Sequence, residues 1–572
     1  MARARATRGS VAAAAAGACL LVALAGCVAI PTSGPINTGD VVLTDPGPAI
    51  DLANDPPPDG TPEEIVNGFL SAGAAGVSDE FVVARKFLDP ATAARWDPTA
   101  RVLVYPLQGG GPEIEVREDG TAVVSVPVEG SLDGDGVYTE APTGAQEELS
   151  LELRRNADGQ WRISALDDVV LMSASSFANL YRRMPVYFAS LDGEQLVPEV
   201  RWFPTVRIAT AAVRALLAGP SAWLRDVVQT GAPDGTQLGI GAVTVTDQVA
   251  TVALSAEAGT ASESQRNLLL AQLDATLERV PGAAVSDVLV TVGDGGPWAS
   301  TATTVPVRDV SPPNGPYVLA EGQLSLVEDG VVRPVDDAAD LTGRAVHDPA
   351  VSLDEQVRVV LEGAGQLLAL PTGGDAPTPL FSGTALLAPS IDRFDWVWTG
   401  ERAPSGGLTA VSADGEAVPV AVDWLDGRSV RSMRVSRDGD RVVVVHTGVS
   451  APAVAIDVAA VVRDETGRPQ RLGDERLQIG AGMDDATQVV WVDEGTVAVL
   501  GRSGSLTLPT IHLVPVGGPS AALTLVDGTE SIAAGRGDRS LYLTDTEGTL
   551  RSRQGTSWVV VATDVRDPVF PG

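Results

Sequence analysis

The chain has 572 residues, in which 74 acidic residues outnumber 40 lysines and arginines and give a formal net charge of −34. A chain of this length is too long to fold around a single hydrophobic core, so we predict several domains. Because 44% of the residues are hydrophobic, the composition excludes a generally disordered protein. The acidic excess argues against a nucleic-acid-binding protein, which needs a basic surface to contact phosphate groups.

The first residues predict an export signal. Arg3, Arg5 and Arg8 precede an uncharged apolar run over 11–25, and a basic segment before a short apolar one is typical of a secretory signal peptide. The run is shorter than the ~20 residues that span a bilayer, so a retained transmembrane helix is the less favoured alternative. We expect residues 1–26 to be removed as a signal peptide.

The apolar run ends in Leu24-Ala25-Gly26-Cys27. This tetrad resembles the bacterial lipobox, in which the cysteine receives a diacylglycerol group before cleavage. The resemblance predicts lipidation of Cys27 and cleavage between Gly26 and Cys27; the alternative is an accidental cysteine at the end of an ordinary signal peptide. Cys19 is the only other cysteine and lies in the removed segment, so the mature chain would form no internal disulfide.

A lipidated N-terminus and a spacer are predicted over residues 27–60, because this segment is rich in Pro, Gly, Asn and Asp and has no apolar period. Helical signals begin directly afterwards. Thr61 and Glu64 have the spacing of a capping box, and Pro62 suits a first helical turn. A helix therefore starts at Thr61, with Ile65 on its buried face.

The first predicted domain covers residues 61–172 and has α+β character. A second helix is expected from about Asp79, with an apolar side that includes Phe87. Beyond Trp96 the pattern alternates as in strands, and a hairpin turn leads into a strand with Trp161 facing a core. Helices followed by a curved antiparallel sheet are the expected architecture. The predicted strands lie at 101–105, 114–116, 122–128, 149–153 and 161–163.

A second α+β domain is predicted over residues 184–298. Two strands precede a helix from about Val206 that ends at Gly219-Pro220, and a hairpin follows with its turn at Asp247-Gln248. Ser262 begins another capping box and helix. The unit resembles the GerMN domain of sporulation and germination proteins, which implies no catalytic group. The resemblance rests on four sequence blocks at 215–221, 233–236, 252–255 and 273–277.

From Tyr317 onward the chain is nearly all strand and turn, and we assign residues 317–572 to an all-β propeller-like domain. Segments with a polar start, an apolar strand and a turn recur at intervals of roughly forty to fifty residues, which is typical of propeller blades. About 250 residues at this period predict about six blades. An all-β sandwich pair is the alternative. The repeated segments begin at Ser352, Ser390, Ser436, Val489 and Ser531.

No catalytic, cofactor or metal site is predicted. The three histidines, His347, His446 and His512, all lie in the propeller region without a second ligand at metal spacing. The sequence has no metalloprotease, nucleophile-elbow or P-loop motif. We therefore expect a non-enzymatic protein without a cofactor.

Acidic pairs and tryptophans each allow two interpretations. The pairs at 167–168, 336–337 and 484–485 could act as glycosidase carboxylates or calcium ligands, but among 74 acids adjacent pairs arise by chance. Trp396, Trp398 and Trp424 could stack on sugar rings at a propeller face. Since alternate residues of a strand share one face, the sequence favours a role in blade cores.

The complete layout resembles the LpqB family of actinobacterial lipoproteins. The resemblance covers the lipobox, the segment 28–35 after it, the α+β domain, the GerMN-like domain and the degenerate propeller. It implies a lipoprotein on the extracytoplasmic face of the cell membrane. It also implies a link to the MtrA–MtrB two-component system through the extracellular part of the sensor kinase, with effects on the cell envelope and division.

The lipid at Cys27 would confine the chain to the membrane and raise its effective concentration against membrane-bound partners. We therefore expect a modulator of the sensor kinase. The alternative is a lipoprotein that binds cell-wall glycan or peptide, with the propeller as the receptor. A propeller hydrolase forms a third class, for which the sequence nominates no residues.

Overall fold

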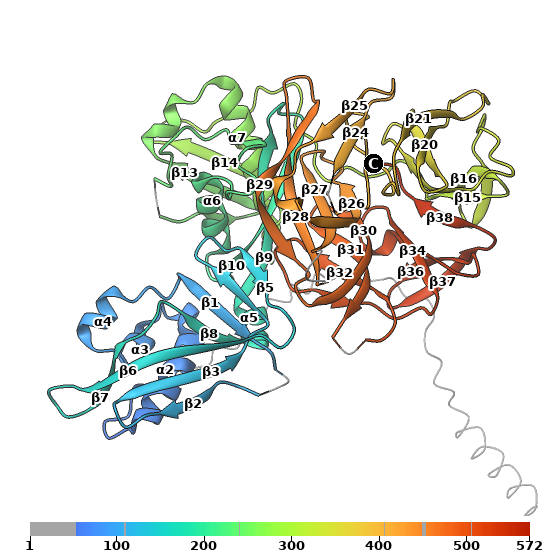
Figure 1. Cartoon of the computed structure of the whole chain (residues 1–572). Helices are drawn as coiled ribbons and strands as arrows, with labels where there is room; N and C mark the ends of the chain where they lie inside the picture. Colours follow the sequence, from blue (N-terminus) through green and yellow to red (C-terminus); the bar gives the residue numbers. More distant parts are fainter. Residues whose placement is uncertain are drawn as a thin grey trace, which may run out of the picture. The chain divides into compact units, whose positions relative to one another are not determined.

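The computed structural model describes residues 53–107, 110–239, 241–293, 295–404, 407–448, 453–504 and 506–572. The predicted signal peptide 1–26 and the lipobox Leu24–Cys27 lie outside these residues, as does most of the spacer 27–60. Within the described residues, no helix is both long and apolar enough to span a bilayer. The structure has an α+β N-terminal region and an all-β C-terminal region (Figure 1).

Helix α2 (Pro62–Ala75) begins as the sequence predicted. The Thr61 side chain accepts a hydrogen bond from the backbone N–H of Glu64, and the Glu64 carboxylate accepts one from the N–H of Thr61, which completes the capping box. Ile65 and Phe69 lie buried on its inner face. The predicted cap therefore marks the beginning of the first helix.

The second helix begins later than predicted and is short. Glu80 and Phe81 adopt left-handed backbone angles, so the chain forms only the short helix α3 (Val82–Arg85). Asp89 then caps a separate helix, α4 (Pro90–Arg95). The apolar side chains, including Phe87, are nevertheless buried. The pattern thus identified core residues correctly but overestimated how regular their backbone is.

Two four-stranded sheets, rather than one curved sheet, complete this region. One has the order β5-β4-β1-β8 and the other β2-β3-β6-β7. The β1–β8 pair is parallel, which the expected antiparallel sheet did not include. The strands are β1 (Arg101–Tyr105), β2 (Glu113–Val116), β3 (Thr121–Pro127), β4 (Gly130–Asp133), β5 (Tyr138–Glu140), β6 (Gln146–Arg155), β7 (Trp161–Ala165) and β8 (Val170–Ser173).

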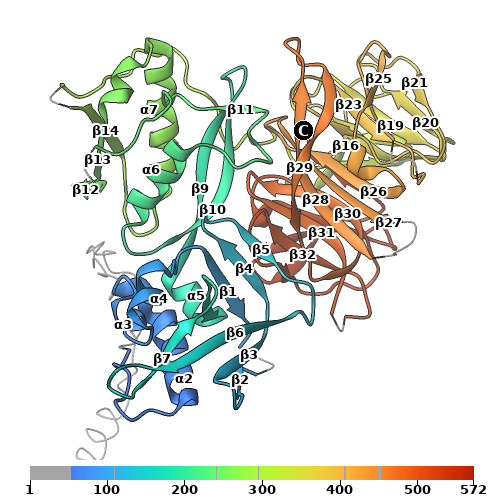
Figure 2. The same cartoon turned by 60° about the vertical axis from the view of Figure 1, so that its left-hand side comes forward.

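The next region begins after helix α5 (Ala174–Leu180) with the long hairpin β9 (Tyr181–Ser190) and β10 (Leu196–Pro204). Helix α6 (Ile208–Ala218) ends at Gly219, whose φ of +92° suits a glycine. Helix α7 (Glu263–Leu277) begins at the predicted Ser262 capping box and packs beside α6 (Figure 2). The remaining strands are β11 (Val228–Gln229), β12 (Thr244–Thr246), β13 (Val249–Leu254) and β14 (Asp287–Val292), and the predicted turn at Asp247-Gln248 joins β12 to β13.

The described residues from 317 to 569 form six four-stranded antiparallel sheets. Each has the strand number of a propeller blade. The sheets are β38 (Arg566–Val569) with β15 (Tyr317–Ala320), β16 (Gln323–Glu328) and β17 (Val331–Pro334); β18 (Val346–Val351), β19 (Arg358–Glu362), β20 (Gln366–Ala369) and β21 (Thr378–Ser382); β22 (Ser390–Ile391), β23 (Val397–Gly400), β24 (Leu408–Val411) and β25 (Ala417–Val420); β26 (Arg428–Val435), β27 (Arg441–Gly448), β28 (Val454–Arg463) and β29 (Pro469–Ile479); β30 (Met483–Asp493), β31 (Thr496–Ser503), β32 (Thr510–Pro515) and β33 (Ala521–Ala522); and β34 (Thr529–Ala534), β35 (Leu541–Asp545), β36 (Leu550–Gln554) and β37 (Ser557–Ala562).

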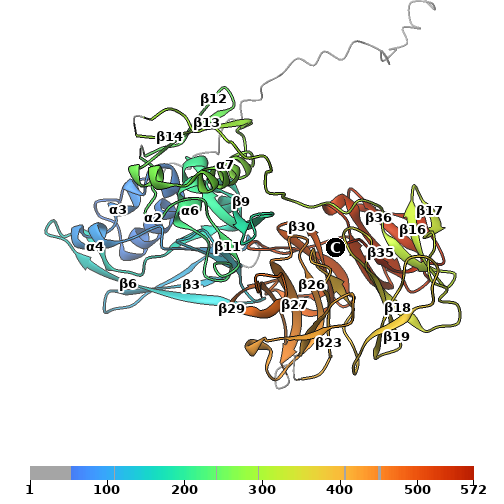
Figure 3. The same cartoon turned by 90° about the horizontal axis from the view of Figure 1, so that it is seen from above.

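The six sheets close into a ring. The inner strands β38, β18, β22, β26, β30 and β34 contact one another in sequence, and β34 returns to β38. The last strand, β38, pairs with β15, so the chain end completes the sheet that the domain began with. Figure 3 shows the C-terminus among these sheets. A closed ring excludes the alternative of two stacked sandwiches, in which inner strands would not follow one another in a cycle.

Candidate functional site

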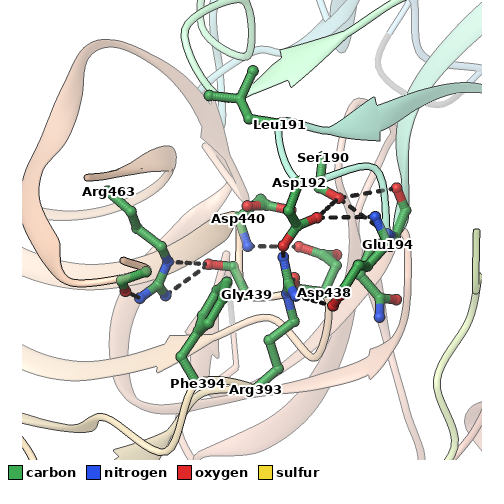
Figure 4. Close-up of polar contacts among 12 residues, drawn as sticks. Ser190, Leu191, Asp192, Glu194, Arg393, Phe394, Asp438, Gly439, Asp440 and Arg463 are labelled. Carbon is green, nitrogen blue, oxygen red and sulfur yellow. Dashed lines mark hydrogen bonds and ion pairs between the residues drawn. The ribbon is translucent and has the colours of Figure 1, made fainter. Parts of the chain in front are cut away.

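The tip of the β9–β10 hairpin contacts the propeller through a charged side chain. Ser190 donates a hydrogen bond to Asp192, and the backbone N–H of Glu194 donates another, which fixes the Asp192 carboxylate at the tip. The free oxygen of that carboxylate forms an ion pair with Arg393, which follows β22 (Figure 4). Arg393 is largely buried in this position and also lies 3.4 Å from the Glu194 carboxylate. The hairpin is therefore held by an arginine of the propeller.

Arg393 also joins two neighbouring sheets of the propeller. Its Nε donates to the carbonyl oxygen of Asp438 in the β26–β27 turn at 2.7 Å. Its guanidinium stacks 4.0 Å from the centroid of the Phe394 ring, and Arg463 of β28 stacks on the same ring at 4.6 Å. Arg463 in turn donates to the carbonyl oxygen of Gly439 at 2.8 Å. These contacts order the loop ends that face the hairpin (Figure 4).

A fully buried ion pair lies beneath this contact. Arg441, which is 0% exposed, donates to the Asp438 carboxylate through both Nε and Nη2. Burial opposes ionisation of Asp438, but the Arg441 charge and hydrogen bonds outweigh it and hold the pKa of this carboxyl below its usual range. Arg441 also donates to the carbonyl oxygen of Pro198 in β10 at 3.4 Å and stacks over Trp491. The pair therefore links the propeller to the hairpin.

Asp440 has the opposite electrostatic behaviour in the same turn. It is buried, and Oδ2 of its carboxyl has no hydrogen-bond partner among the described residues. Burial, followed by repulsion from the Asp438 carboxylate, raises the pKa of Asp440 to about 8. Arg393 and Arg463 act against this rise, and Asp192 adds to it. At neutral pH the turn thus holds one ionised and one protonated aspartic acid, which avoids two adjacent buried charges.

Further along the hairpin, polar contacts continue to the β30–β31 and β32–β33 turns. Tyr187 donates its hydroxyl hydrogen to Glu494, and burial raises the pKa of both groups. The Trp202 indole N–H donates to the carbonyl oxygen of Gly517 at 2.7 Å. We call this whole region, from the hairpin tip to Trp202 and the propeller turns that it contacts, the junction.

A cleft of about 480 Å³ opens beside the junction. Charges of both signs line it: Arg183 from β9, Arg279 from the segment after α7, Asp309 from the connecting segment, and Glu494 and Arg536 from the propeller. Arg536 donates to Asp309 through two nitrogens at 2.8 and 2.6 Å. The volume lies within the range of small-molecule sites, and charged groups converge on the cleft.

The three histidines lie apart, in three different sheets. His446 is buried between Asp457, at 2.7 Å, and Arg428. His512 contacts Ser503, and burial lowers the pKa of its imidazole. His347 contacts Asp348 on β18. Within the described ranges, no group of three His, Cys, Asp or Glu side chains is arranged to hold a metal ion.

The acidic pairs do not converge either. Asp485 is neutralised by Arg431 and Arg502 on neighbouring strands, and Asp168 accepts a hydrogen bond from the backbone of Asp97. Each of these two carboxylates therefore has a partner within the chain.

The tryptophans follow the core interpretation. Trp398 is fully buried and donates to Asp392 at 2.7 Å, while Trp396 and Trp424 pack against the same apolar cluster.

The residues of the junction carry little signal in the sequence. The repeated segment at Ser436 was noted only as a strand signal, although the same Ser-x-Asp pattern begins at Ser352 and Ser390. In two of these segments the serine hydroxyl donates to the aspartate two residues later at 2.6 Å. The pattern therefore marks a carboxylate at or directly after three of the six inner strands, β18, β22 and β26. Arg393 and Arg463 carry no comparable signal, since their partners are far away in the chain.

Three family models match consecutive parts of the chain. Residues 55–178 match the N-terminal domain of lipoprotein LpqB, residues 185–295 match a sporulation and spore germination domain, and residues 322–571 match the LpqB beta-propeller domain. A lipoprotein LpqB of Cutibacterium acnes is 30% identical, over 87% of this chain and 88% of its own length. The chain belongs to the LpqB family of lipoproteins.

Other LpqB proteins resemble the chain over most of its length. The lipoprotein LpqB of Bifidobacterium longum is 29% identical over 81% of both chains, and that of Thermobifida fusca is 27% identical over 98% of this chain and 99% of its own. Solved structures are more distant. Hydrazine synthase of Kuenenia stuttgartiensis covers 45% of this chain and is covered over 79% of its own length, at 15% identity and a TM-score of 0.31, which is too low to indicate a shared fold.

Proposed function

We propose that this chain is a non-enzymatic lipoprotein, anchored through lipid on Cys27 to the extracytoplasmic face of the cell membrane, that modulates an MtrB-like sensor kinase. Through the kinase it would influence cell-envelope homeostasis and division. Its domains would cover residues 61–172, 184–298 and 317–572. Membership of the LpqB family and the sequence Leu24-Ala25-Gly26-Cys27 support the anchor.

The junction is the structural observation that supports a modulator. Arg393 and Arg441 hold the β9–β10 hairpin against the propeller through an ion pair with Asp192 at the hairpin tip and a buried hydrogen bond to Pro198. Two domains held in this way offer a preorganised surface, so little entropy is lost when a partner binds them. A lipid tether adds to this by confining both partners to one membrane. If this chain binds one conformation of the kinase more tightly than another, its binding shifts the conformational equilibrium of the kinase towards that conformation.

In-cell crosslinking followed by affinity recovery tests this proposal. The anchored protein is compared with Cys27→Ala expressed at an equal level, and the recovered material is probed for the sensor kinase. We expect the kinase with the anchored protein and much less with Cys27→Ala. Absence of the kinase from both samples would contradict the proposal.

The cleft beside the junction favours a second candidate, a lipoprotein that binds cell-wall glycan or peptide. Arg183 and Arg279 could contact the carboxylates of a wall peptide, and Glu494 could contact its amines. Calorimetric titration of the purified chain with soluble wall fragments tests this candidate without the kinase. Binding that Arg183→Ala weakens would support it, and no heat of binding at millimolar fragment would exclude it.

A further inference from the structure

The outer strands of the propeller differ in how their free edges are protected. Each of the six sheets ends in an outer strand, namely β17, β21, β25, β29, β33 or β37. The free edge of such a strand presents unpaired backbone N–H and C=O groups that can pair with another chain. Natural proteins usually protect these edges with proline, with charged side chains or by making the strand very short.

Five of the six outer strands carry such protection. Strand β17 ends in Arg333-Pro334. Strands β21 and β25 contain Pro379 and Pro419. Strand β29 begins at Pro469 and bears several charged side chains, and β33 has only two residues. These features prevent regular pairing with a further strand.

Strand β37 has none of these features. Its sequence is Ser-Trp-Val-Val-Val-Ala, six residues without a charge or a proline. Aromatic and β-branched residues favour strand pairing. It pairs with β36 on one side and ends its sheet on the other. Across the described chain, the backbone of 557–562 forms no hydrogen bond to any strand other than β36. We call residues 557–562 the β37 edge.

The β37 edge also exposes apolar side chains. Val559 is 40% exposed and Val560 is 50% exposed. The Trp558 indole N–H donates a hydrogen bond to the carbonyl oxygen of Thr524 at 3.1 Å, which ties the strand to the β33–β34 connection. Strand β17 approaches β37 and adds Val331, which is also exposed. The edge thus combines a free row of backbone groups with exposed apolar side chains on both faces of the strand, the two features that strand addition uses.

We propose that the β37 edge binds an extended, apolar segment of a second protein by strand addition. Two acidic residues lie near the C-terminal end of the edge. Asp564 follows the edge in the chain. Asp329 precedes Gly330, whose backbone is close to Val561: a Cβ added at Gly330 would lie 3.6 Å from the Val561 carbonyl oxygen. A basic residue beside the bound segment would complement them. Pairing with a second copy is disfavoured, because it would bring together two strongly acidic chains.

The proposal requires a protein partner, as the proposed function does, but it does not require that partner to be the sensor kinase. Its test uses the full chain in its host membrane. The two cysteines of the sequence lie in the signal peptide and at the lipidation position, so Val560→Cys adds one free thiol. A thiol-directed photocrosslinker is attached there. The matched control is Leu508→Cys, a residue that is 45% exposed in a loop between two strands.

We expect Val560→Cys to crosslink a segment that mass spectrometry maps to an uncharged, β-branched run next to a basic residue. The control should give at least about tenfold less adduct, and Val560→Lys should lower partner recovery by about tenfold, because a lysine at a free edge blocks strand pairing. Thermal unfolding of Val560→Lys, compared with Leu508→Lys, checks that both variants are folded.

Three results would overturn the proposal: no adduct above the control, an adduct only with a second copy of the chain, or an adduct to a charged or helical segment. The test also separates this proposal from the proposed function. If the kinase is recovered equally well with Val560→Lys, the kinase proposal stands and the β37 edge is not its docking surface. If the crosslinked strand belongs to a protein other than the kinase, the edge proposal stands, and the kinase proposal is decided by the Cys27→Ala recovery experiment alone.

Discussion

Replacing Arg441 with alanine should destabilise the junction strongly. The guanidinium is 0% exposed and forms an ion pair with Asp438, a hydrogen bond to the carbonyl oxygen of Pro198 and a stacking contact with Trp491. Its removal leaves the Asp438 carboxylate buried without its main partner. Losing one member of a buried ion pair typically costs about 3–5 kcal/mol.

The size of the effect can be compared with a matched exposed pair. Arg468 and Glu416 lie 2.9 Å apart, with side chains that are 41% and 56% exposed. Such a pair contributes about 0–1 kcal/mol, so Arg468→Ala should change stability little. For a unit of propeller size, 1 kcal/mol corresponds to a shift of about 2–4 °C in Tm. We therefore expect Arg441→Ala to lower the Tm by roughly 6–20 °C.

Differential scanning calorimetry of the purified chain, with tryptophan fluorescence as a second probe, measures both variants. Limited proteolysis should also cut Arg441→Ala faster near the β9–β10 hairpin, because the contact with Pro198 is lost. Equal shifts for Arg441→Ala and Arg468→Ala, or a destabilisation by Arg441→Ala below about 1 kcal/mol, would refute the reasoning that burial makes this pair important.

Three further predictions concern single residues. Because the pKa of Asp440 is raised to about 8 in the folded chain, the folded state holds a proton that the unfolded state releases near pH 4. The free energy of unfolding should therefore fall as the pH rises from about 4 to about 8, and urea titrations should show a smaller fall for Asp440→Asn. Gly439 has a φ of +80°, and a Cβ added there would lie 2.9 Å from the Arg393 side chain. Gly439→Ala should therefore lower the free energy of unfolding, measured in urea, by about 1–2 kcal/mol or more, and an unchanged value would contradict the geometry. Cys27→Ala should move the protein from the membrane to the soluble fraction; retention in the membrane would show that lipid on this residue is not the anchor.

Local signals in the sequence predicted the beginnings of elements well. The capping boxes at Thr61 and Ser262 and the turn at Asp247-Gln248 depend on residues close together in the chain, and all three are confirmed. The recurring strand pattern also predicted an all-β region, because alternation with turns survives even when the repeats are degenerate. These features follow from short-range chemistry that a sequence displays directly.

Features that depend on distant residues were missed or wrong. Strands β1 and β8 pair in parallel although all four strands of the other sheet lie between them in the chain. The alternation of apolar and polar residues within a strand does not predict which distant strand it pairs with. The helix expected from about Asp79 begins only at Val82, because Glu80 and Phe81 adopt left-handed backbone angles. The junction brings Asp192 against Arg393, about 200 positions further along the chain. Its charged side chains resemble ordinary surface residues until the fold brings them together.

The proposed modulation of a membrane-bound kinase is tested most directly by reconstitution. The sensor kinase is placed in vesicles with lipidated protein or with Cys27→Ala at the same total concentration, and the rate of autophosphorylation is measured. The account predicts that the lipidated protein changes the rate and that Cys27→Ala has a much smaller effect, because only the tethered form reaches a high local concentration. A rate that is the same with lipidated protein, with Cys27→Ala and with neither would contradict the account.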